Sequence, residues 1–418
     1  MDQFIIEGGR PLKGSVVISG SKNAALPILI ATLLTDEPCF IENVPTRLRD
    51  LRTTFRLLES LGKKVVIRGT SVTVLANGSL KTQAPYDLVK QMRASVLAAG
   101  PLLARFGLVR VPMPGGCAIG LRPIDIHLKA FEALGARRIA DHGDIILSAA
   151  RLKPSRVRFK FPSVGATENL LMAAAALEGV TVIENAAREP EIEDLAAFLV
   201  KLGAKIKGAG TPRIEVRGQR TLHGARHTVI ADRIEAGTFL LACAMAKGRL
   251  KLLGAVPAHL TALVAKMKAA GAHIKATSSG LEIAMAGRPR HVDIETKPHP
   301  GFPTDLQAPW MSWMSLARGR SKVSETVFEN RFLHVAELAR MGAEIGVRGR
   351  SATIDGVPTL HGAPIMASDI RAGAALLVAA VAAEGTTRLQ RVYHIDRGYE
   401  QVEAKLRAVG VRIRRVNP

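Results

Sequence analysis

The sequence predicts an α/β protein of two similar domains, each with three helices surrounded by small sheets. Three observations lead to this fold class. The chain has 418 residues, and that length favours two domains of about 200 residues over a single core. A pattern of about seventy residues occurs six times along the chain. Several helices are rich in alanine and leucine on all sides, which is typical of buried helices.

The repeat is marked by a helix that ends in an apolar residue, then a glycine, then a basic or polar strand. The six glycines are separated by 73, 68, 68, 71 and 68 residues, by subtraction of their numbers. Glycine suits this point because it adopts the left-handed conformation without steric cost. The positions are Gly62, Gly135, Gly203, Gly271, Gly342 and Gly410.

A second mark, in register with the first, is an alanine-rich helix that closes on a glycine before a strand. It occurs at Gly179, Gly248, Gly319 and Gly385. Each repeat therefore has two helices and several strands, with early helices expected at 24–34 and 88–103. A six-repeat solenoid would need polar caps, so we expect two clusters of three repeats with a boundary near 228–232.

The composition is that of a folded globular protein, with 47% hydrophobic and 22% charged residues. The longest nearly apolar runs, 24–34 and 372–383, are shorter than the roughly 20 residues of a spanning helix, so we expect no membrane insertion. The N-terminus lacks the basic segment of an export signal. Cys39, Cys117 and Cys243 form no CxxC pair, which favours the reducing cytoplasm. Cys39 and Cys243 are expected in the core.

The formal net charge of +22 has three interpretations. An excess of this size can mark a nucleic-acid binder, but the basic residues are spread from Arg10 to Arg415 and aromatic residues for base stacking are few. We therefore expect no nucleic-acid partner. A solvated basic surface and a basic cleft for an anionic substrate remain.

The stretch 112–123 reads PMPGGCAIGLRP. Proline removes backbone donors and glycine weakens helices and strands, so the stretch predicts a loop that presents Cys117. An isolated cysteine is more often a small buried hydrophobe than a reactive group. The glycines have the outer spacing of a P-loop, but Leu121 and Arg122 replace its lysine and hydroxyl residue. His223 and His227 lie four residues apart without further ligands, and we expect no metal.

Charged residues begin several apolar helices. Asp232, Asp305 and Asp369 stand at such positions, and the ordinary interpretation of each is an N-cap. Lys22 and Arg371 oppose the positive end of the helix dipole, which an anion between them would relieve. Three arginines in glycine- or proline-punctuated loops, suited to phosphate or carboxylate, complete a cationic site. They are Arg122, Arg331 and Arg397.

Seven motifs resemble those of the UDP-N-acetylglucosamine 1-carboxyvinyltransferases, enolpyruvyl transferases of the EPSP synthase family. They are SGSKNAALP at 19–27, MRAS at 92–95, PGGCAIG at 114–120, ENAAREPE at 184–191, FPTD at 302–305, FENRF at 328–332 and HIDRGY at 394–399. The resemblance implies an inside-out α/β barrel of two domains, each with three βαβαββ repeats around buried helices. Residues 22–231 would form the first domain, and 1–21 with 232–418 a discontinuous second one.

The resemblance also implies the reaction. The enolpyruvyl group of phosphoenolpyruvate passes to the 3-hydroxyl of UDP-N-acetylglucosamine in the cleft between the domains, without metal or organic cofactor. Because a fold does not fix function, two alternatives stay open: a paralogue that uses another hydroxyl acceptor, and a non-catalytic copy. The sequence leaves the oligomeric state unknown.

Matched position by position, Cys117 is the proton donor to phosphoenolpyruvate and Asp305 the base for the sugar hydroxyl. Lys22, Arg122 and Arg397 surround the phosphate, with Asn23 beside them, and Arg331 and Arg371 hold the carboxylate. Asp369 matches a cleft carboxylate. The nucleotide-sugar positions are Arg93, Arg122, Pro123, Ile124, Asp125, Ile126, Ser163, Val164, Gly165 and Val327. Leu121, Pro309, Trp310 and Trp313 depart from the family pattern, and they flank the thiol loop or the base, where substrate fit is decided.

Overall fold

The computed structural model describes residues 2–90, 92–112, 124–141 and 144–417. These residues form two compact units. The first unit comprises 20–112 and 124–230, and the second comprises 2–19 and 231–417. The boundaries expected from the sequence lie between 21 and 22 and between 231 and 232.

Each unit repeats one topology three times: strand, helix, strand, helix, strand, strand. The complete example in the first unit is β9 (Arg156–Arg158), α6 (Val164–Ala175), β10 (Gly179–Glu184), α7 (Pro190–Lys201), β11 (Lys205–Lys207) and β12 (Arg213–Gly218). Strand β9 pairs parallel with β10, and β12 lies antiparallel between β10 and β11. The first two strands of the repeat are therefore neighbours, and the fourth lies between the second and the third.

The other two repeats of the first unit follow the same order. One contains β13 (Arg226–Thr228), α1 (Lys22–Ala31), η1 (Thr32–Leu34), β3 (Cys39–Glu42), α2 (Arg49–Ser60), β4 (Lys63–Arg68) and β5 (Ser71–Ala76). The other contains α3 (Tyr86–Val89), η2 (Arg93–Ala98), α4 (Ala99–Phe106), β6 (Leu108–Pro112), α5 (Asp125–Ala133), β7 (Arg137–Asp141) and β8 (Asp144–Ser148). In the latter the first strand is reduced to one parallel bridge, Gln83 to Arg110.

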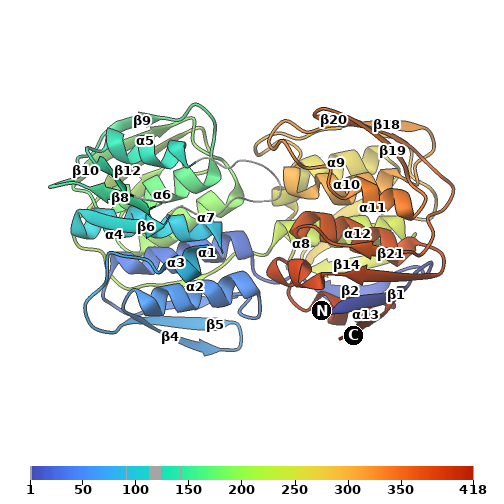
Figure 1. The fold of residues 1–418 in the computed structure, drawn as a ribbon, viewed down its shortest axis with the longest axis horizontal. Coiled ribbons are helices and arrows are strands. Elements are labelled where there is room, and N and C mark those ends of the chain that lie inside the picture. Colours follow the sequence, from blue (N-terminus) through green and yellow to red (C-terminus); the bar gives the residue numbers. More distant parts are fainter. Residues whose placement is uncertain (1, 91, 113–123, 142–143, 418) are drawn as a thin grey trace. The chain divides into compact units, whose positions relative to one another are not determined.

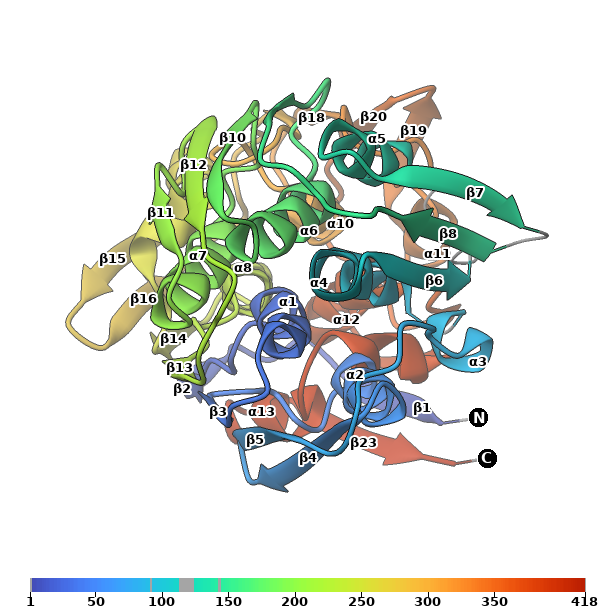
Figure 2. The same cartoon turned by 90° about the vertical axis from the view of Figure 1, so that its left-hand side faces the viewer.

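Helices α1, α4 and α6 lie inside the first unit, with its three sheets outside them (Figure 2). All but one residue of α1 is buried. Such a helix has no polar face to offer to water, because alanine, leucine and isoleucine surround it. Helix α2 differs: its apolar residues are buried, and its charged residues other than Asp50 are exposed. The two marks in the sequence correspond to these two kinds of helix: the first mark follows the kind with exposed charged residues, such as α2, and the second follows the buried kind, such as α6.

The helix expected at 88–103 is wrong as a single element. Helix α3 ends at Val89, a 3-10 helix covers 93–98, and α4 begins at Ala99. Pro101 accounts for the change from the 3-10 helix to α4, because proline farther inside an α-helix would lose a hydrogen bond and clash with the carbonyl four residues earlier. In the structure Pro101 lies in the first turn of α4, where no such donor is required.

The second unit also contains three repeats. The first is β2 (Lys13–Val17), α8 (Arg233–Met245), β14 (Arg249–Leu253), η3 (Pro257–Leu260), α9 (Thr261–Ala269), β15 (His273–Thr277) and β16 (Gly280–Ala284). The second is β17 (Ile294–Glu295), η4 (Thr304–Leu306), α10 (Gln307–Met314), β18 (Arg320–Ser324), α11 (Val335–Arg340), β19 (Glu344–Arg348) and β20 (Ser351–Asp355). The third is β21 (Pro364–Met366), α12 (Ile370–Ala382), β22 (Thr386–Gln390), η5 (Val392–Arg397), α13 (Val402–Ala408), β23 (Arg412–Val416) and β1 (Gln3–Glu7).

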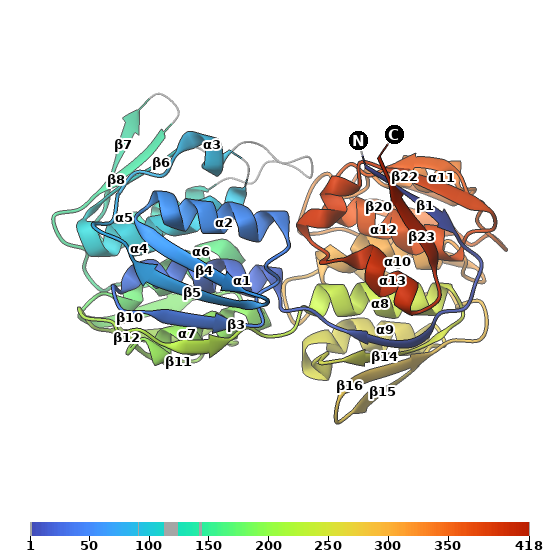
Figure 3. The same ribbon diagram turned by 90° about the horizontal axis from the view of Figure 1, so that it is seen from below.

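The chain passes from one unit to the other at two places. Strand β1, at the N-terminus, pairs antiparallel with β22 and β23 of the second unit (Figures 1 and 3). Strand β2 leads into α1 but pairs with β14, while β13 leads into α8 but pairs with β3. Helices α1 and α8 therefore each begin directly after the chain has passed from one unit to the other.

The six repeat glycines confirm the predicted helix ends. Their φ angles are 104°, 97°, 119°, 108°, 92° and 101° in chain order, all in the left-handed region. The second mark holds at all four positions, since each glycine follows the end of a buried helix and lies at or directly before the start of the next strand. Gly179, Gly319 and Gly385 have positive φ, whereas Lys247 takes the left-handed conformation before Gly248. Gly248 is required for another reason: a Cβ atom at this position would lie 2.4 Å from the carbonyl oxygen of Leu12.

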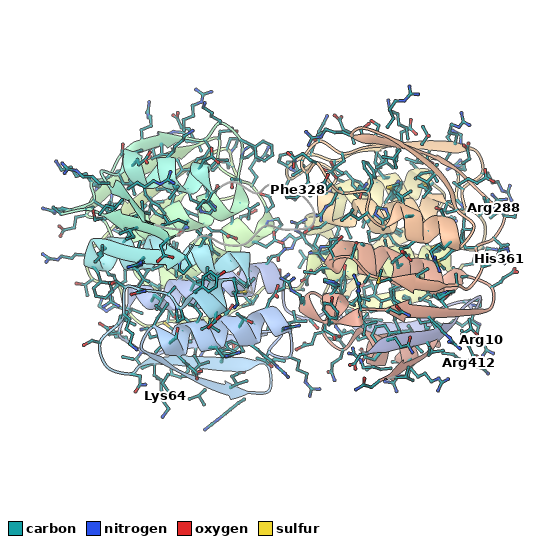
Figure 4. The ribbon with its side chains drawn as sticks, in the orientation of Figure 1. Arg10, Lys64, Arg288, Phe328, His361 and Arg412 are labelled. Atoms are coloured by element: carbon teal, nitrogen blue, oxygen red, sulfur yellow. The ribbon has the colours of Figure 1, made fainter. Side chains whose placement is uncertain are left out.

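Cys39 and Cys243 are buried, as expected. No helix of the described residues is long and apolar enough to cross a membrane. The basic side chains are distributed over the exterior of both units, as the labelled Lys64, Arg10 and Arg412 illustrate (Figure 4). Lys205 and Arg217 even face each other in the β11–β12 pair.

Candidate active site

Asp305 lies between two arginines of the second unit. It belongs to η4, directly before α10. Its Oδ1 atom accepts a hydrogen bond from Nη2 of Arg331 at 2.5 Å, and its Oδ2 atom accepts one from Nη2 of Arg371 at 3.0 Å. The Arg331 side chain is only 4% exposed. The residues matched to the base and to the carboxylate holders thus form one cluster.

The three aspartates at helix starts differ in their contacts. Asp232 caps α8 by accepting from the backbone of Ile234 and Glu235. Asp369 caps α12 in the same way. The N-cap interpretation is therefore confirmed for these two, but it is wrong for Asp305, because Pro303 occupies the cap position of η4.

Arg371 is held on both sides. Besides its hydrogen bond to Asp305, Arg371 donates through Nη1 to the hydroxyl oxygen of Tyr399 at 3.2 Å. That oxygen lies 3.0 Å from Oγ1 of Thr238. Burial alone would lower the pKa of Arg371, but the charges of Asp305, Tyr399 and Asp232 raise it above its ordinary value. The guanidinium group stays charged in this buried place, and a guanidinium group held in this way has the geometry to pair with a carboxylate.

His334 is a residue of this region that sequence reasoning missed. It is fully buried, and its Nε2 atom has no hydrogen-bond partner among the described residues. Burial lowers the pKa of His334 to about 4, while Asp369 raises it and Arg331 lowers it further. The ring is neutral at physiological pH. Its position three residues after Arg331, within an otherwise apolar run, was the available signal.

Lys22 is the first residue of α1, which Ser21 caps by accepting from the backbone of Ala24. Its Nζ atom lies 3.2 Å from Oδ2 of Asp50, in the first turn of α2, and both side chains are buried. This carboxylate, which sequence reasoning missed, offsets part of the unfavourable interaction between the lysine and the helix dipole. Asn23 is half-buried beside Lys22.

The segments 124–126 and 163–165 meet at His127. Ser163 caps α6, and a Cβ atom on Gly165 would lie 3.2 Å from the ring of His127. Asn169 accepts from the backbone of Gly100 through its side-chain oxygen, so its nitrogen faces Nδ1 of His127 at 3.1 Å as a donor. In the neutral ring the proton is therefore on Nε2. Sequence reasoning missed His127, which follows the predicted segment directly.

The other predicted positions of the first unit are less constrained. Ile124 is buried at the start of α5, and Ile126 is half-buried. Asp125 is exposed and lies 3.7 Å from Lys129. Val164 is half-buried in the first turn of α6. Cys117, Arg122, Pro123 and Leu121 lie outside the described residues, as does the side chain of Arg93.

In the second unit, Arg397 ends η5. The backbone nitrogen of Val327 donates to Oε1 of Glu325 at 2.8 Å. The two tryptophans expected to affect substrate fit are instead core residues. Trp310 and Trp313 are fully buried and pack edge to face against each other, and Trp310 packs in the same way against Phe302. Pro309 lies in the first turn of α10, where a missing N–H group is tolerated.

The two histidines considered for metal binding have other partners. Nδ1 of His223 lies 2.9 Å from Oε1 of Glu37, and Nε2 of His227 lies 2.8 Å from Oδ1 of Asp194. No group of three or more histidine, cysteine or acidic side chains in the described part of the chain could hold a metal ion.

Comparison with known proteins identifies the family. The family model of EPSP synthase (3-phosphoshikimate 1-carboxyvinyltransferase) matches residues 6–406. The chain belongs to the EPSP synthase family. It is 56% identical over 416 residues to the UDP-N-acetylglucosamine 1-carboxyvinyltransferase of Nitratidesulfovibrio vulgaris strain Hildenborough, covering 99% of each chain. It is 53% identical over 418 residues to the Lawsonia intracellularis protein of the same name, covering 100% of each.

Solved structures agree. The enolpyruvyl transferase NikO from Streptomyces tendae superposes with a TM-score of 0.88 at 25% identity, covering 100% of this chain and 99% of that one. The EPSP synthase of Acinetobacter baumannii shares the fold alone, with a TM-score of 0.75 at 16% identity and full coverage of both chains. The predicted fold class and family are confirmed.

Proposed function

We propose that this protein transfers the enolpyruvyl group of phosphoenolpyruvate to the 3-hydroxyl of UDP-N-acetylglucosamine and releases phosphate. One geometric observation carries the proposal: the Asp305 carboxylate lies between the buried guanidinium groups of Arg331 and Arg371. In the proposal Asp305 is the base, and the two guanidinium groups beside it are suited to the substrate carboxylate. Full-length identity above 50% to relatives of this name supports the choice of acceptor.

The reaction needs a proton removed from one place and delivered to another. Asp305 takes the proton of the sugar 3-hydroxyl as the oxygen bonds to C2 of phosphoenolpyruvate, and Cys117 protonates the methylene carbon. A cysteine thiol with an ordinary pKa near 8.5 is mostly protonated at neutral pH and can act as this acid. The tetrahedral intermediate then loses phosphate from C2 and a proton from the methyl carbon, which restores the enol ether.

Cations are required because phosphoenolpyruvate is a polyanion throughout. In the proposal Lys22, Arg122 and Arg397 surround its phosphate, and Arg331 and Arg371 hold its carboxylate. Positive groups aimed at developing negative charge stabilise a transition state more than they would in water. Lys22 belongs to the first unit, whereas Asp305 and Arg397 belong to the second, so the proposed reaction requires groups of both units.

The nucleotide sugar is assigned to positions that the family resemblance implies. They are Arg93, Arg122, Pro123, Ile124, Asp125, Ile126, Ser163, Val164, Gly165 and Val327. Asn23, beside the phosphate groups, and Asp369, a cleft carboxylate, complete the proposed substrate-binding positions. The capped start of α6 at Ser163 supports part of this assignment, since free backbone N–H groups at a helix start favour an anion. No metal or organic cofactor is needed.

The product of this reaction is the enolpyruvyl ether of the nucleotide sugar. In the proposal this step commits UDP-N-acetylglucosamine to peptidoglycan, so the protein acts in the cytoplasm and its activity supports cell shape and cell division. The antibiotic fosfomycin would target it through the thiol of Cys117.

A phosphate-release assay tests the function. The purified protein is incubated with phosphoenolpyruvate and, separately, UDP-N-acetylglucosamine, shikimate 3-phosphate or no acceptor. We expect phosphate release only with UDP-N-acetylglucosamine, and a product whose mass is that of its enolpyruvyl ether. Release with another acceptor alone would favour the paralogue, and binding without release would favour the non-catalytic copy.

A further inference from the structure

Glu325 is a buried carboxylate that the proposed reaction does not use. It follows β18 and is 1% exposed. Its Oε1 atom accepts hydrogen bonds from the backbone nitrogens of Val327 at 2.8 Å and Phe328 at 3.0 Å. Its Oε2 atom accepts from Oγ1 of Thr304 at 2.9 Å. Both oxygens are therefore occupied by donors, as the burial of a carboxylate requires.

The bond to Glu325 fixes the direction of the Thr304 hydroxyl. A threonine hydroxyl has one proton and two acceptor lone pairs. Because the proton is donated to Glu325, the lone pairs are available to Arg331, whose Nε atom lies 3.2 Å away. The same guanidinium group donates through Nη2 to Asp305. A series of hydrogen bonds thus connects Glu325 through Thr304 and Arg331 to the proposed base, Asp305.

The Arg331 guanidinium group also packs against an aromatic ring. It lies 5.0 Å from the ring centre of Phe328, the residue whose backbone nitrogen Glu325 holds. Glu325 therefore acts on Arg331 by two routes: through the Thr304 hydroxyl, and through the loop that carries Phe328. The same loop carries Val327, which the proposal assigns to the nucleotide sugar.

We propose that Glu325 is a positioning residue for the reaction, because it orients Thr304 and thereby fixes Arg331 against Asp305. This inference rests on the proposed roles of Asp305 and Arg331. A carboxylate is needed at this position because only a group that accepts on both oxygens can hold the two backbone nitrogens and the threonine proton together. A glutamine can keep the backbone bonds through its oxygen, but its nitrogen would donate to Thr304 and reverse the hydroxyl.

The test compares E325Q, T304V, T304S and the double variant E325Q/T304V by steady-state phosphate release. We expect E325Q and T304V each to lower kcat about 10- to 100-fold, since misplacing a reacting group has effects of this size. T304S keeps the hydroxyl and should stay within about threefold of the unaltered protein. The KM for UDP-N-acetylglucosamine should change little in all of them, because the Val327 bond remains.

The double variant separates positioning from general structural support. If the two side chains act as one chain, E325Q/T304V loses no more activity than either single variant, since coupled residues are not additive. D293N serves as the matched control. Asp293 is an exposed carboxylate that accepts from the backbone nitrogen of Lys322, in the middle of β18, so its loss should leave kcat unchanged.

Three outcomes would overturn the inference: unaltered kcat in T304V, an equal loss in T304S and T304V, or losses that multiply in the double variant. D305N distinguishes this failure from failure of the proposed function. If D305N retains full activity, the assignment of the base is wrong. If D305N is inactive while E325Q and T304V are fully active, only the positioning role is wrong.

Discussion

At the residue scale, the contacts of Asp305 separate it from two aspartates that stand in similar sequence positions. Asp232 and Asp369 bind backbone N–H groups at helix starts, whereas Asp305 binds two guanidinium groups. A carboxylate at a helix start has enough backbone donors nearby to be satisfied locally. The Asp305 carboxylate is instead satisfied by side chains 26 and 66 residues away in sequence. Long-range partners of this kind mark a binding site more strongly than a cap does.

The Cys117 thiol is predicted to react with fosfomycin. The sequence predicts a loop that carries both Cys117 and Arg122, and a cation near a thiol raises the fraction of thiolate, the form that opens the epoxide. We expect a mass spectrum of the digested protein to show one adduct, on the peptide that contains Cys117. C117S is the control and should show none. An adduct on Cys39 or Cys243 instead would contradict the prediction, because both are buried.

The lowered pKa of His334 predicts that the free energy of unfolding decreases in acid. Its pKa is about 4 in the folded protein and about 6.5 when unfolded, so the unfolded chain binds a proton first as the pH falls. Stability is therefore full above pH 6.5 and lost between pH 6.5 and 4. The difference between pH 7 and pH 5 is about 2 kcal/mol for this group. Asp369 and Arg331 face the ring with opposite effects.

Urea unfolding of the unaltered protein and of H334Q at pH 7 and pH 5 measures this effect. The unaltered protein should lose about 2 kcal/mol more than H334Q between the two pH values. Equal pH dependence in the two proteins would show that His334 does not carry it.

At the element scale, the helix ends explain why the repeat is visible in the sequence. Each of the six marked helices turns into a strand through a glycine with positive φ. The steric cost of a Cβ atom in that conformation acts on the residue itself, whatever surrounds it. The mark therefore survives in every repeat, while the strands around it differ in length.

Substitution of Gly410 tests this conformational explanation. Its φ is 101°, and a Cβ atom would meet nothing within 4 Å. G410A should destabilise the protein by about 1–2 kcal/mol from backbone conformation alone. Urea unfolding curves measure the change. G287A is the matched control, since Gly287 also has open space but no positive φ, and there we expect at most a small stabilisation of about 0.4–1 kcal/mol.

At the scale of the whole molecule, most of the basic side chains behind the net charge of +22 lie on the exterior of the described parts of the two units. Basic side chains such as Lys205 and Arg217 lie opposite each other on sheet surfaces. Salt screens repulsion between exposed charges over distances of about 10 Å at 0.1 M. The self-repulsion of the folded chain should therefore decrease as salt is added.

Thermal unfolding at 20 mM and 300 mM sodium chloride tests this prediction. Relief of about 1 kcal/mol should raise Tm by about 2–4 °C in units of this size. Sodium chloride is used because phosphate would also bind at the proposed site. An unchanged or lower Tm at high salt would contradict an origin in general repulsion.

The sequence alone determined the repeat, the helix ends and the buried character of the helices. Glycine conformation and helix packing faces depend on residues within one or two turns, so Gly62 and the alanine-rich run of α1 carry that information locally. Local patterns also identified Lys22 and Arg371 as cations in unfavourable places. The change from 3-10 helix to α4 was missed because the local effect of Pro101 was overlooked.

Only the tertiary structure decided which strands pair and which partners the charged side chains have. The exchange of β2 and β13 depends on pairing between strands more than 180 residues apart, and no local pattern records it. The same holds for the partner of Lys22 and for the two arginines on Asp305. Burial of Trp310 and Trp313 likewise depends on the tertiary structure, which encloses α10 on all sides. Contacts between distant residues exist only after the chain has closed, so the sequence marked the charged groups and the fold chose their partners.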